Sequence, residues 1–151
     1  MTLTYQQETV ETVEVDIVPL MHAHNDELQE DLSKEYPLDV NMAVYRRMAA
    51  SGVLRIFTAR DDGVMAGYAT FIVIPSHHRR GMVVAHEDAL YMKPEFRRGR
   101  VAMRLMKFAE DSLKGSCQVV IYHCPVAKPH FGILLTKLGY EPYATYHVRR
   151  L

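Results

Sequence analysis

The chain has 151 residues, 48% apolar and 24% charged, a composition typical of one globular domain with a hydrophobic core. Its 18 basic and 18 acidic residues balance, so no global field draws it to nucleic acid or an anionic membrane. It lacks both the run of about 18 apolar residues that a membrane span needs and the layout of a signal peptide. Cys117 and Cys124 are an odd number of residues apart on one predicted strand, so we expect no disulfide between them and a cytoplasmic protein.

The charges are unevenly distributed. Residues 1–39 carry ten acidic side chains and a single basic one, Lys34. Basic residues gather instead at 79–80, at 93–107 and at the C-terminal end. This pattern predicts a local basic site on a protein that is not basic as a whole.

The N-terminal half is predicted to contain three strands and two helices. A clean alternation of Val13, Val15 and Ile17 with polar residues predicts the first strand, and helical apolar spacing after Asp39 predicts a capped helix. Asp61-Asp62-Gly63 is typical of a hairpin turn. The expected elements are a strand at 11–17, helices at 20–33 and 40–50, and strands at 53–60 and 64–74.

The C-terminal half alternates strands and helices. A helix between two strands predicts a crossover with locally parallel pairing, whereas the hairpins over 53–92 predict antiparallel pairing. The fold class is therefore α/β (α+β), a mixed, mostly antiparallel sheet with helices on both faces, in a single domain over 1–151. The further expected elements are strands at 82–92, 118–123 and 143–150 and helices at 97–114 and 129–138.

Residues 93–106 are the most informative segment. A strand ending at Met92 passes through a short basic turn into an amphipathic helix. The first N–H groups of a helix have no partner within it, and the helix dipole favours negative charge there. Arg97, Arg98 and Arg100 add donors that suit phosphate oxygens. The segment predicts a phosphate site, and the plainer alternative is a solvated basic helix start.

The element order and two motifs resemble the GNAT superfamily of acetyl-CoA-dependent N-acetyltransferases, over roughly residues 11–150. Residues 97–102, Arg-Arg-Gly-Arg-Val-Ala, fill the family's loop Gln/Arg-x-x-Gly-x-Gly/Ala. Residues 134–140, Leu-Leu-Thr-Lys-Leu-Gly-Tyr, stand where the family has Leu-Tyr-Glu-Lys-x-Gly-Phe. The layout is also similar to small acetyltransferase-like proteins encoded by tailed phages.

Three positions depart from the family pattern. Arg100 stands where the second motif glycine is usual, with Gly99 one residue earlier. Leu135 stands where many members have a tyrosine that protonates the departing CoA thiolate, and Lys128 where many have an asparagine near the cofactor. The first departure bears on cofactor binding and the second on catalysis.

The resemblance implies direct attack of an amine on the thioester of acetyl-CoA, which acts as co-substrate, and no metal. Adjacent His77 and His78 lack a third ligand at zinc spacing, which agrees with the absence of a metal site. The cofactor-binding residues that the resemblance implies are Tyr91, Met92, Arg97, Arg98, Gly99, Arg100, Val101, Ala102 and Lys128.

The proposed proton acceptor is Asp88, with Glu87 as second choice. Asp88 matches the glutamate that resembles a proton acceptor in spermidine/spermine-type acetyltransferases. Strand alternation places it with His86 on one face and Glu87 on the other. The alternative is a strand carboxylate paired to an arginine. No proton donor is assigned, since Leu135 cannot serve, and the nearby tyrosines and the set His123, Cys124 and His130 carry no specific motif.

The acceptor is an amine of unspecified kind: a small polyamine, a protein lysine, an N-terminal amine or an aminoacyl-tRNA. The acidic N-terminal third favours a polyamine or a lysine. The alternative function is a catalytically weak GNAT-fold protein that binds CoA or a partner protein as a regulator, which Leu135 and Arg100 would support. Nucleic acid is disfavoured by the balanced charge, and an exposed strand at 143–150 would suit a homodimer.

Overall fold

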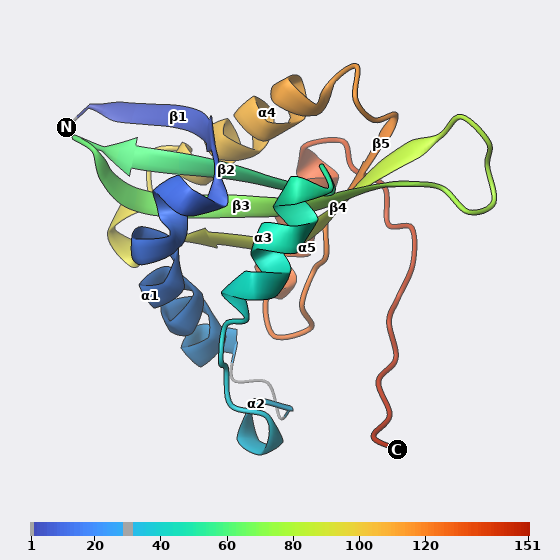
Figure 1. Ribbon diagram of the computed structural model, residues 1–151, viewed down its shortest axis with the longest axis horizontal. Helices are drawn as coiled ribbons and strands as arrows, with labels where there is room; N and C mark the ends of the chain where they lie inside the picture. The colour runs from blue at the N-terminus through green and yellow to red at the C-terminus, as the bar shows by residue number, and fades with distance from the viewer. Residues whose placement is uncertain (1, 29–31) are drawn as a thin grey trace.

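Five strands form one sheet in chain order, from β1 to β5. The computed structural model describes residues 2–28 and 32–151 (Figure 1). Neighbouring strands from β1 to β4 are antiparallel, and β4 pairs with β5 in parallel across a helix, as expected. The elements are β1 (Leu3–Glu8), α1 (Val10–Leu28), α2 (Leu32–Glu35), α3 (Met42–Ala50), β2 (Leu54–Asp61), β3 (Val64–Pro75), β4 (Val83–Met92), the 3-10 turn η1 (Pro94–Phe96), α4 (Val101–Leu113), β5 (Val119–Ile121) and α5 (Pro129–Lys137).

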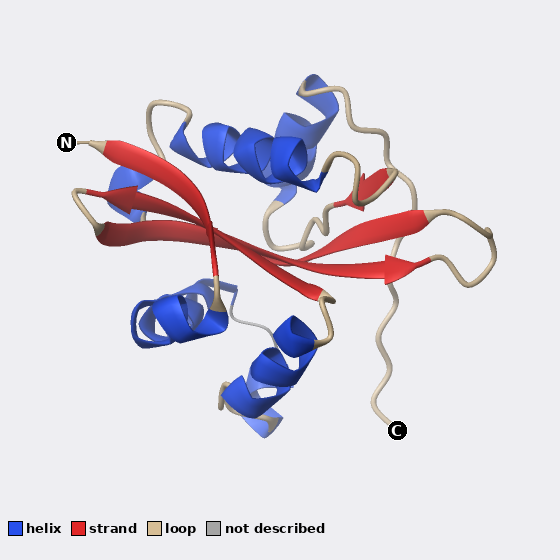
Figure 2. Cartoon of the chain, turned by 45° about the horizontal axis from the view of Figure 1, so that its top comes forward, coloured by secondary structure: helices blue, strands red, loops and turns tan. Residues whose placement is uncertain are grey.

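Helices cover both faces of the sheet, which confirms the predicted fold class. Figure 2 shows α1 and α3 on one side of the strands and α4 and α5 on the other. Each side has its own buried cluster: Phe57, Phe71 and Leu105 lie in the one beneath α4, and Ile17 and Tyr68 in the one beneath α1. None of the described helices is long and apolar enough to cross a membrane.

The strand predicted at 11–17 is wrong, because these residues begin the helix α1. Its buried residues follow the three- and four-residue spacing of a helix face, whereas Val15 is 86% exposed. The alternation of Val13, Val15 and Ile17 is thus too short to distinguish the two periods. The first strand instead lies at Leu3–Glu8 and pairs with β2.

Several boundaries also differ from those expected. The helix predicted at 20–33 is the second half of α1, and residues 29–31 lie outside the described part. Asn41, not Asp39, caps α3, because its Oδ1 accepts a hydrogen bond from the Val44 N–H. The expected helix at 97–114 begins only at Val101, after η1. The hairpin at 61–63 and the helix at 129–138 are confirmed within a residue or two.

The closing strand predicted at 143–150 is wrong. Residues 141–151 have no regular secondary structure and are exposed along their whole length. Tyr143, Tyr146 and Val148 are each at least 73% exposed. Residues that favour strands do not form one where no neighbouring strand accepts their hydrogen bonds. The homodimer stays a prediction.

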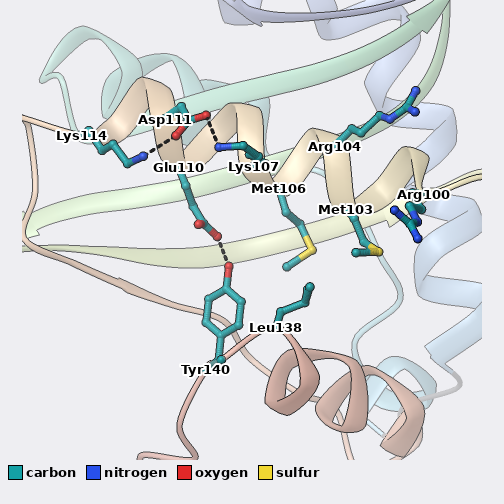
Figure 3. Close-up of a pocket in the computed structure, with 11 residues that line it drawn as sticks. Arg100, Met103, Arg104, Met106, Lys107, Glu110, Asp111, Lys114, Leu138 and Tyr140 are labelled. Carbon is teal, nitrogen blue, oxygen red and sulfur yellow. Dashed lines mark hydrogen bonds and ion pairs between the residues drawn. The ribbon is translucent and has the colours of Figure 1, made fainter.

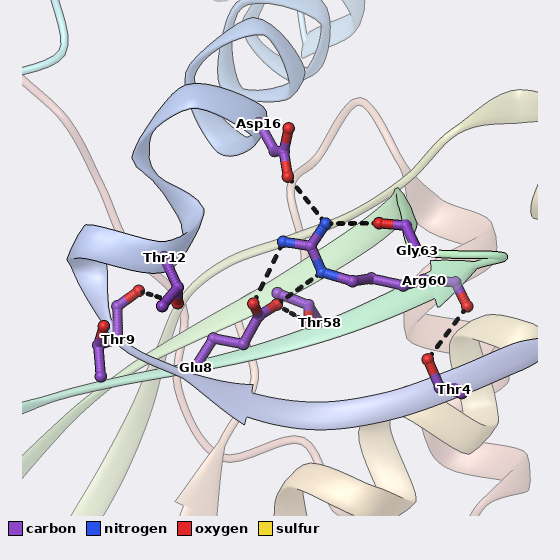
Figure 4. Close-up of polar contacts among 8 residues, drawn as sticks. All are labelled: Thr4, Glu8, Thr9, Thr12, Asp16, Thr58, Arg60 and Gly63. Atoms are coloured by element: carbon purple, nitrogen blue, oxygen red, sulfur yellow. Dashed lines mark hydrogen bonds and ion pairs between the residues drawn. The ribbon is translucent and has the colours of Figure 1, made fainter.

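One buried cation joins β1, α1, β2 and the hairpin turn (Figure 4). Arg60 donates through Nε and Nη2 to the two carboxylate oxygens of Glu8, at 2.9 and 3.2 Å, and through Nη1 to Asp16 at 2.8 Å and the Gly63 carbonyl at 2.9 Å. The side chains of Arg60 and Glu8 are each only 11% exposed. Burial alone would raise the pKa of Glu8, but hydrogen bonds from Arg60 and Thr58 hold it below its usual value.

Replacing Arg60 should therefore destabilise the fold. In Arg60→Leu the Glu8 carboxylate stays buried without a cation, and we expect the free energy of unfolding to fall by about 3 kcal/mol at pH 7. Arg46→Leu, which breaks the exposed pair with Glu14, is the control and should cost about 1 kcal/mol or less. Urea denaturation measures both variants, and equal losses would contradict this role of Arg60.

The Arg60 contribution should also depend on pH. The pKa of Glu8 is lower in the folded protein than its ordinary value of 4.5, so ionised Glu8 stabilises the fold above that pH. This stability is lost as the pH falls through the folded-state pKa. The gap in unfolding free energy between wild type and Arg60→Leu should consequently narrow below pH 4.5, and a constant gap down to pH 2 would argue against the mechanism.

Candidate active site

The pairing of β4 with β5 ends after three residues. Val84 to His86 pair with Val119 to Ile121, and the next contact across the gap is made by a side chain. The His123 N–H donates to Glu87 Oε2 at 3.0 Å, which takes the place of the next backbone hydrogen bond. From Glu87 to Met92, β4 has a strand partner on its β3 side only, within the described part of the chain. This free edge of β4 (residues 87–92) can bind an extended ligand.

A β-bulge interrupts β4 at the candidate base. Thr70 is opposite Ala89 and Phe71 opposite Glu87, so Asp88 is the extra residue. Asp88 Oδ2 accepts hydrogen bonds from the hydroxyls of Tyr45 and Thr70, each at 3.1 Å. Asp88 is exposed, on the side of the sheet covered by α3. Two donors therefore fix an accessible carboxylate.

Glu87, the second choice, lies in a different environment. Its side chain is only 7% exposed, and its partner is His123, whose Nδ1 lies 3.5 Å from Glu87 Oε2 and 2.5 Å from the Glu87 carbonyl oxygen. Burial raises the pKa of Glu87, and the hydrogen bond and charge of His123 oppose this. The structure thus separates the two carboxylates, with Asp88 open to an acceptor and Glu87 enclosed.

The predicted phosphate loop has an unusual backbone. Gly99 and Arg100 are both left-handed, with φ of 70° and 65°, and α4 begins at the next residue. Glycine adopts this conformation freely, but an arginine does so at a cost. No side chain caps α4, so the first N–H groups of the helix are available to an anion. Arg98 and Arg100 are exposed, and their side chains bond to none of the described residues.

Three predicted cofactor residues meet at Glu27, near the end of α1. Arg97 Nη2 donates to Glu27 Oε1 at 2.6 Å, the Tyr91 hydroxyl donates to the same oxygen at 3.3 Å, and Lys128 Nζ lies 3.6 Å from Oε2. Arg97 Nε also donates to the Met92 carbonyl at 2.8 Å. Arg97 is therefore committed to holding the loop against β4 and α1. Glu27 could not be predicted from the sequence, because its contact with Arg97 spans 70 residues.

Three of the predicted cofactor residues are buried in the core. Tyr91 and Met92 are each 5% exposed, and Val101 is 4% exposed. A side chain at Gly67 would place its Cβ 2.6 Å from Met92 Sδ, so the end of β4 lies close against β3. At Tyr91 and Met92, only the backbone can meet a ligand.

A groove lies between α4 and the end of α5 (Figure 3). Its volume is about 470 Å³, and it is lined by apolar and basic side chains that include Arg100, Met103, Arg104, Met106 and Leu138. Its acidic groups are already partnered: Glu110 accepts from the hydroxyls of Tyr122 and Tyr140, and Asp111 pairs with Lys107 and Lys114. The cations without described partners, Arg100 and Arg104, lie at its α4 N-terminal end, next to the loop.

Neither Leu135 nor the nearby Tyr140 and Tyr143 is a clear replacement for the tyrosine that protonates the CoA thiolate in many family members. Leu135 is 8% exposed and has no proton to give. Tyr140 donates its hydroxyl to Glu110 in the groove, and burial together with that carboxylate raises its pKa above the usual value. Tyr143 is 80% exposed in the C-terminal segment.

Comparison with solved structures shows a shared fold over the whole chain. A GCN5-related N-acetyltransferase from Ralstonia eutropha has a TM-score of 0.80 at 15% identity, with 99% of each chain covered. A ribosomal-protein-alanine N-acetyltransferase from Brucella melitensis has a TM-score of 0.76 at 14% identity, with 99% of each covered. A predicted acetyltransferase with acetyl-CoA from Clostridium acetobutylicum has a TM-score of 0.74 at 13% identity, covering 99% of this chain and 96% of that one.

The sequence itself shows the family. No curated protein gives a significant match to the chain. Residues 21–131, which include β4, the loop and most of the groove, match the acetyltransferase (GNAT) family. The chain therefore belongs to the GNAT family of acetyltransferases and is a transferase enzyme.

Proposed function

We propose that the enzyme transfers the acetyl group of acetyl-CoA to an amine by direct attack on the thioester. The observation that carries the proposal is the left-handed Gly99-Arg100 turn, which opens the N-terminus of α4 directly beside the groove. An anion site continuous with an apolar groove suits a ligand that has both phosphates and a nucleotide. Acetyl-CoA has both.

Each part of the cofactor has a matching surface. The pyrophosphate would lie at the first N–H groups of α4, with Arg98 and Arg100 as additional donors. The nucleotide end would enter the groove between Met103 and Leu138, with Arg104 near its phosphate. The extended pantetheine arm would run along the free edge of β4. Arg97 and Lys128 support this site through Glu27.

The acceptor amine must lose a proton before or during its attack on the carbonyl carbon. Asp88 is suited to accept it, directly or through a water, because it is exposed and held by Tyr45 and Thr70. The nitrogen then forms a bond to the carbonyl carbon while the carbon–sulfur bond breaks. An accessible carboxylate also attracts a cationic ammonium, which agrees with the acidic N-terminal third.

The acceptor class is a primary amine. Proteins of the same fold include an aminoglycoside acetyltransferase and a glucosamine-6-phosphate N-acetyltransferase, whose named substrates contain amino groups. The exposed site of Asp88 fits a polyamine or a lysine side chain.

Binding of CoA should stabilise the protein. At a CoA concentration a hundredfold above Kd, the gain in unfolding free energy should reach about 2.7 kcal/mol. A thermal-shift titration with CoA and with acetyl-CoA measures it. The absence of a shift with either compound at millimolar concentration would reject the proposal.

Substitutions of Arg100 should separate backbone strain from phosphate binding. Arg100→Gly relieves the left-handed conformation, whereas Arg100→Ala retains it, so the glycine variant should be more stable by about 1 kcal/mol. Both variants lose one cationic donor, and the Kd for CoA should rise about tenfold in each. Chemical denaturation and CoA titration give the two quantities. Unchanged Kd values would exclude Arg100 from the phosphate site.

Asp88→Asn should reduce turnover without affecting cofactor binding. The amide retains an oxygen for Tyr45 and Thr70 but cannot accept the ammonium proton, so kcat should fall roughly 100-fold. Thiol release from acetyl-CoA with spermidine and with a lysine peptide measures turnover. Glu11→Gln, which removes an exposed carboxylate of α1, is the control. Wild-type turnover in Asp88→Asn would remove Asp88 as the base.

A further inference from the structure

We infer that His123 donates the proton that the departing CoA thiolate takes up, and that Glu87 is the positioning residue for His123. This inference rests on the proposed function. It assigns a proton donor to a chain in which Leu135 occupies the position of the family's tyrosine. It is carried by where His123 lies, by which of its nitrogens is free, and by the buried carboxylate beside it.

His123 lies where the two central strands separate. It follows the last residue of β5 by two positions, and its backbone N–H makes the contact with Glu87 at which the free edge of β4 begins. A thioester that runs along this edge passes the end of β5. The His123 side chain is 38% exposed, so a ligand can reach it.

The hydrogen bonds of the ring leave one nitrogen for a ligand. Nδ1 lies 2.5 Å from the Glu87 carbonyl oxygen, and a carbonyl can only accept, so Nδ1 carries a hydrogen. Nε2 has no hydrogen-bond partner among the described residues. It is therefore the nitrogen that can exchange a proton with a bound thioester.

Glu87 holds the ring in place. Its carboxylate lies 3.5 Å from Nδ1, is 7% exposed, and pairs with no lysine or arginine of the described chain. A buried carboxylate needs a hydrogen-bonded partner, and His123 is the one within reach, through its backbone N–H and its ring. Two other titratable side chains face the ring: His86 on β4, stacked with centroids 6.3 Å apart, and Tyr146 of the C-terminal segment at 5.4 Å. Burial, and to a lesser extent His123 itself, lower the pKa of His86.

The proton balance of the step is complete. As the amine nitrogen bonds to the carbonyl carbon, the carbon–sulfur bond breaks and its electron pair goes to sulfur. Sulfur takes the Nε2 proton of His123. The nitrogen loses two protons, the ammonium proton before the attack and a second one once the nitrogen–carbon bond has formed, and both pass through Asp88 to solvent. Solvent returns one proton to His123, so the net release is one proton. A free thiol has a pKa of about 8.5 and an imidazolium of about 6.5, so the transfer to sulfur is favourable.

The test is His123→Ala, with His130→Ala as the matched control on the exposed surface of α5. Single-turnover acetyl transfer should slow roughly 100-fold in His123→Ala, and imidazole in the buffer should restore part of the rate. The CoA thermal shift and the KM for acetyl-CoA should stay at wild-type values. A wild-type rate in His123→Ala would overturn the inference.

Glu87→Gln distinguishes positioning from simple packing. Loss of the carboxylate beside Nδ1 should lower kcat for acetyl transfer and leave the KM for acetyl-CoA unchanged, and Glu87→Asp should restore part of kcat. A wild-type kcat in Glu87→Gln would remove Glu87 from the role. If wild-type protein shows no CoA thermal shift, the proposed function fails. If it binds CoA and transfers acetyl but His123→Ala does so equally fast, only this inference fails.

Discussion

A single hydrogen bond, from the His123 N–H to the Glu87 carboxylate, fixes the point at which β4 and β5 separate. Up to His86 the two strands pair through their backbones, and beyond it a side chain fills the place of the next backbone acceptor. Burying a carboxylate is costly unless it is hydrogen-bonded and paired, and His123 supplies both partners from its backbone and its ring. The free edge of β4 follows from this contact, and so does the position of the proposed donor. A substitution at Glu87 would therefore affect the geometry of both.

The bulge at Asp88 changes which residues of β4 face each side of the sheet. On the N-terminal side of the bulge, Ala85 packs in the cluster beneath α4. On its C-terminal side, Leu90 and Met92 pack in that cluster, and Tyr91 packs in the cluster beneath α1. Without the extra residue, the strict two-residue period would keep odd-numbered residues on one face throughout. The bulge thus lets Glu87 stay on the α4 side while Tyr91 reaches Glu27 on the other side. Arg97, which stacks its guanidinium over Tyr91 at 5.5 Å, is then held at the start of the loop.

The parts of the fold that could be predicted from sequence depend on local signals. The hairpin at Asp61-Asp62-Gly63, the loop at 97–102 and the helix ending before Gly139 each have turn or cap residues next to a periodic segment. The start of α1 is predicted as a strand because Val13, Val15 and Ile17 alternate with polar residues. Val13 and Ile17 are also four residues apart, which fits one face of a helix equally well. The roles of Glu27 and His123 could not be predicted, since each depends on contacts between residues far apart in sequence. The choice of Asp88 and Glu87 as proton acceptors stays a prediction, and their different burial could not be read from strand alternation, because it comes from contacts with α3 and with the segment after β5.

The separation of the two carboxylates by the sheet has a chemical consequence for acetyl transfer. The acceptor must lose a proton and the thiolate must gain one, and a single group serving both would have to change its protonation state within one step. In this fold Asp88 is fixed by Tyr45 and Thr70 on the α3 side, while His123 is oriented by Glu87 at the end of β5. In the proposed mechanism each group would exchange protons with solvent through its own face, as the exposed Asp88 and the partly exposed His123 allow. The bulge and the strand separation together let adjacent residues of β4 serve the two sites, because Asp88 is exposed on the α3 side whereas Glu87 is enclosed and contacts His123 beyond the end of β5.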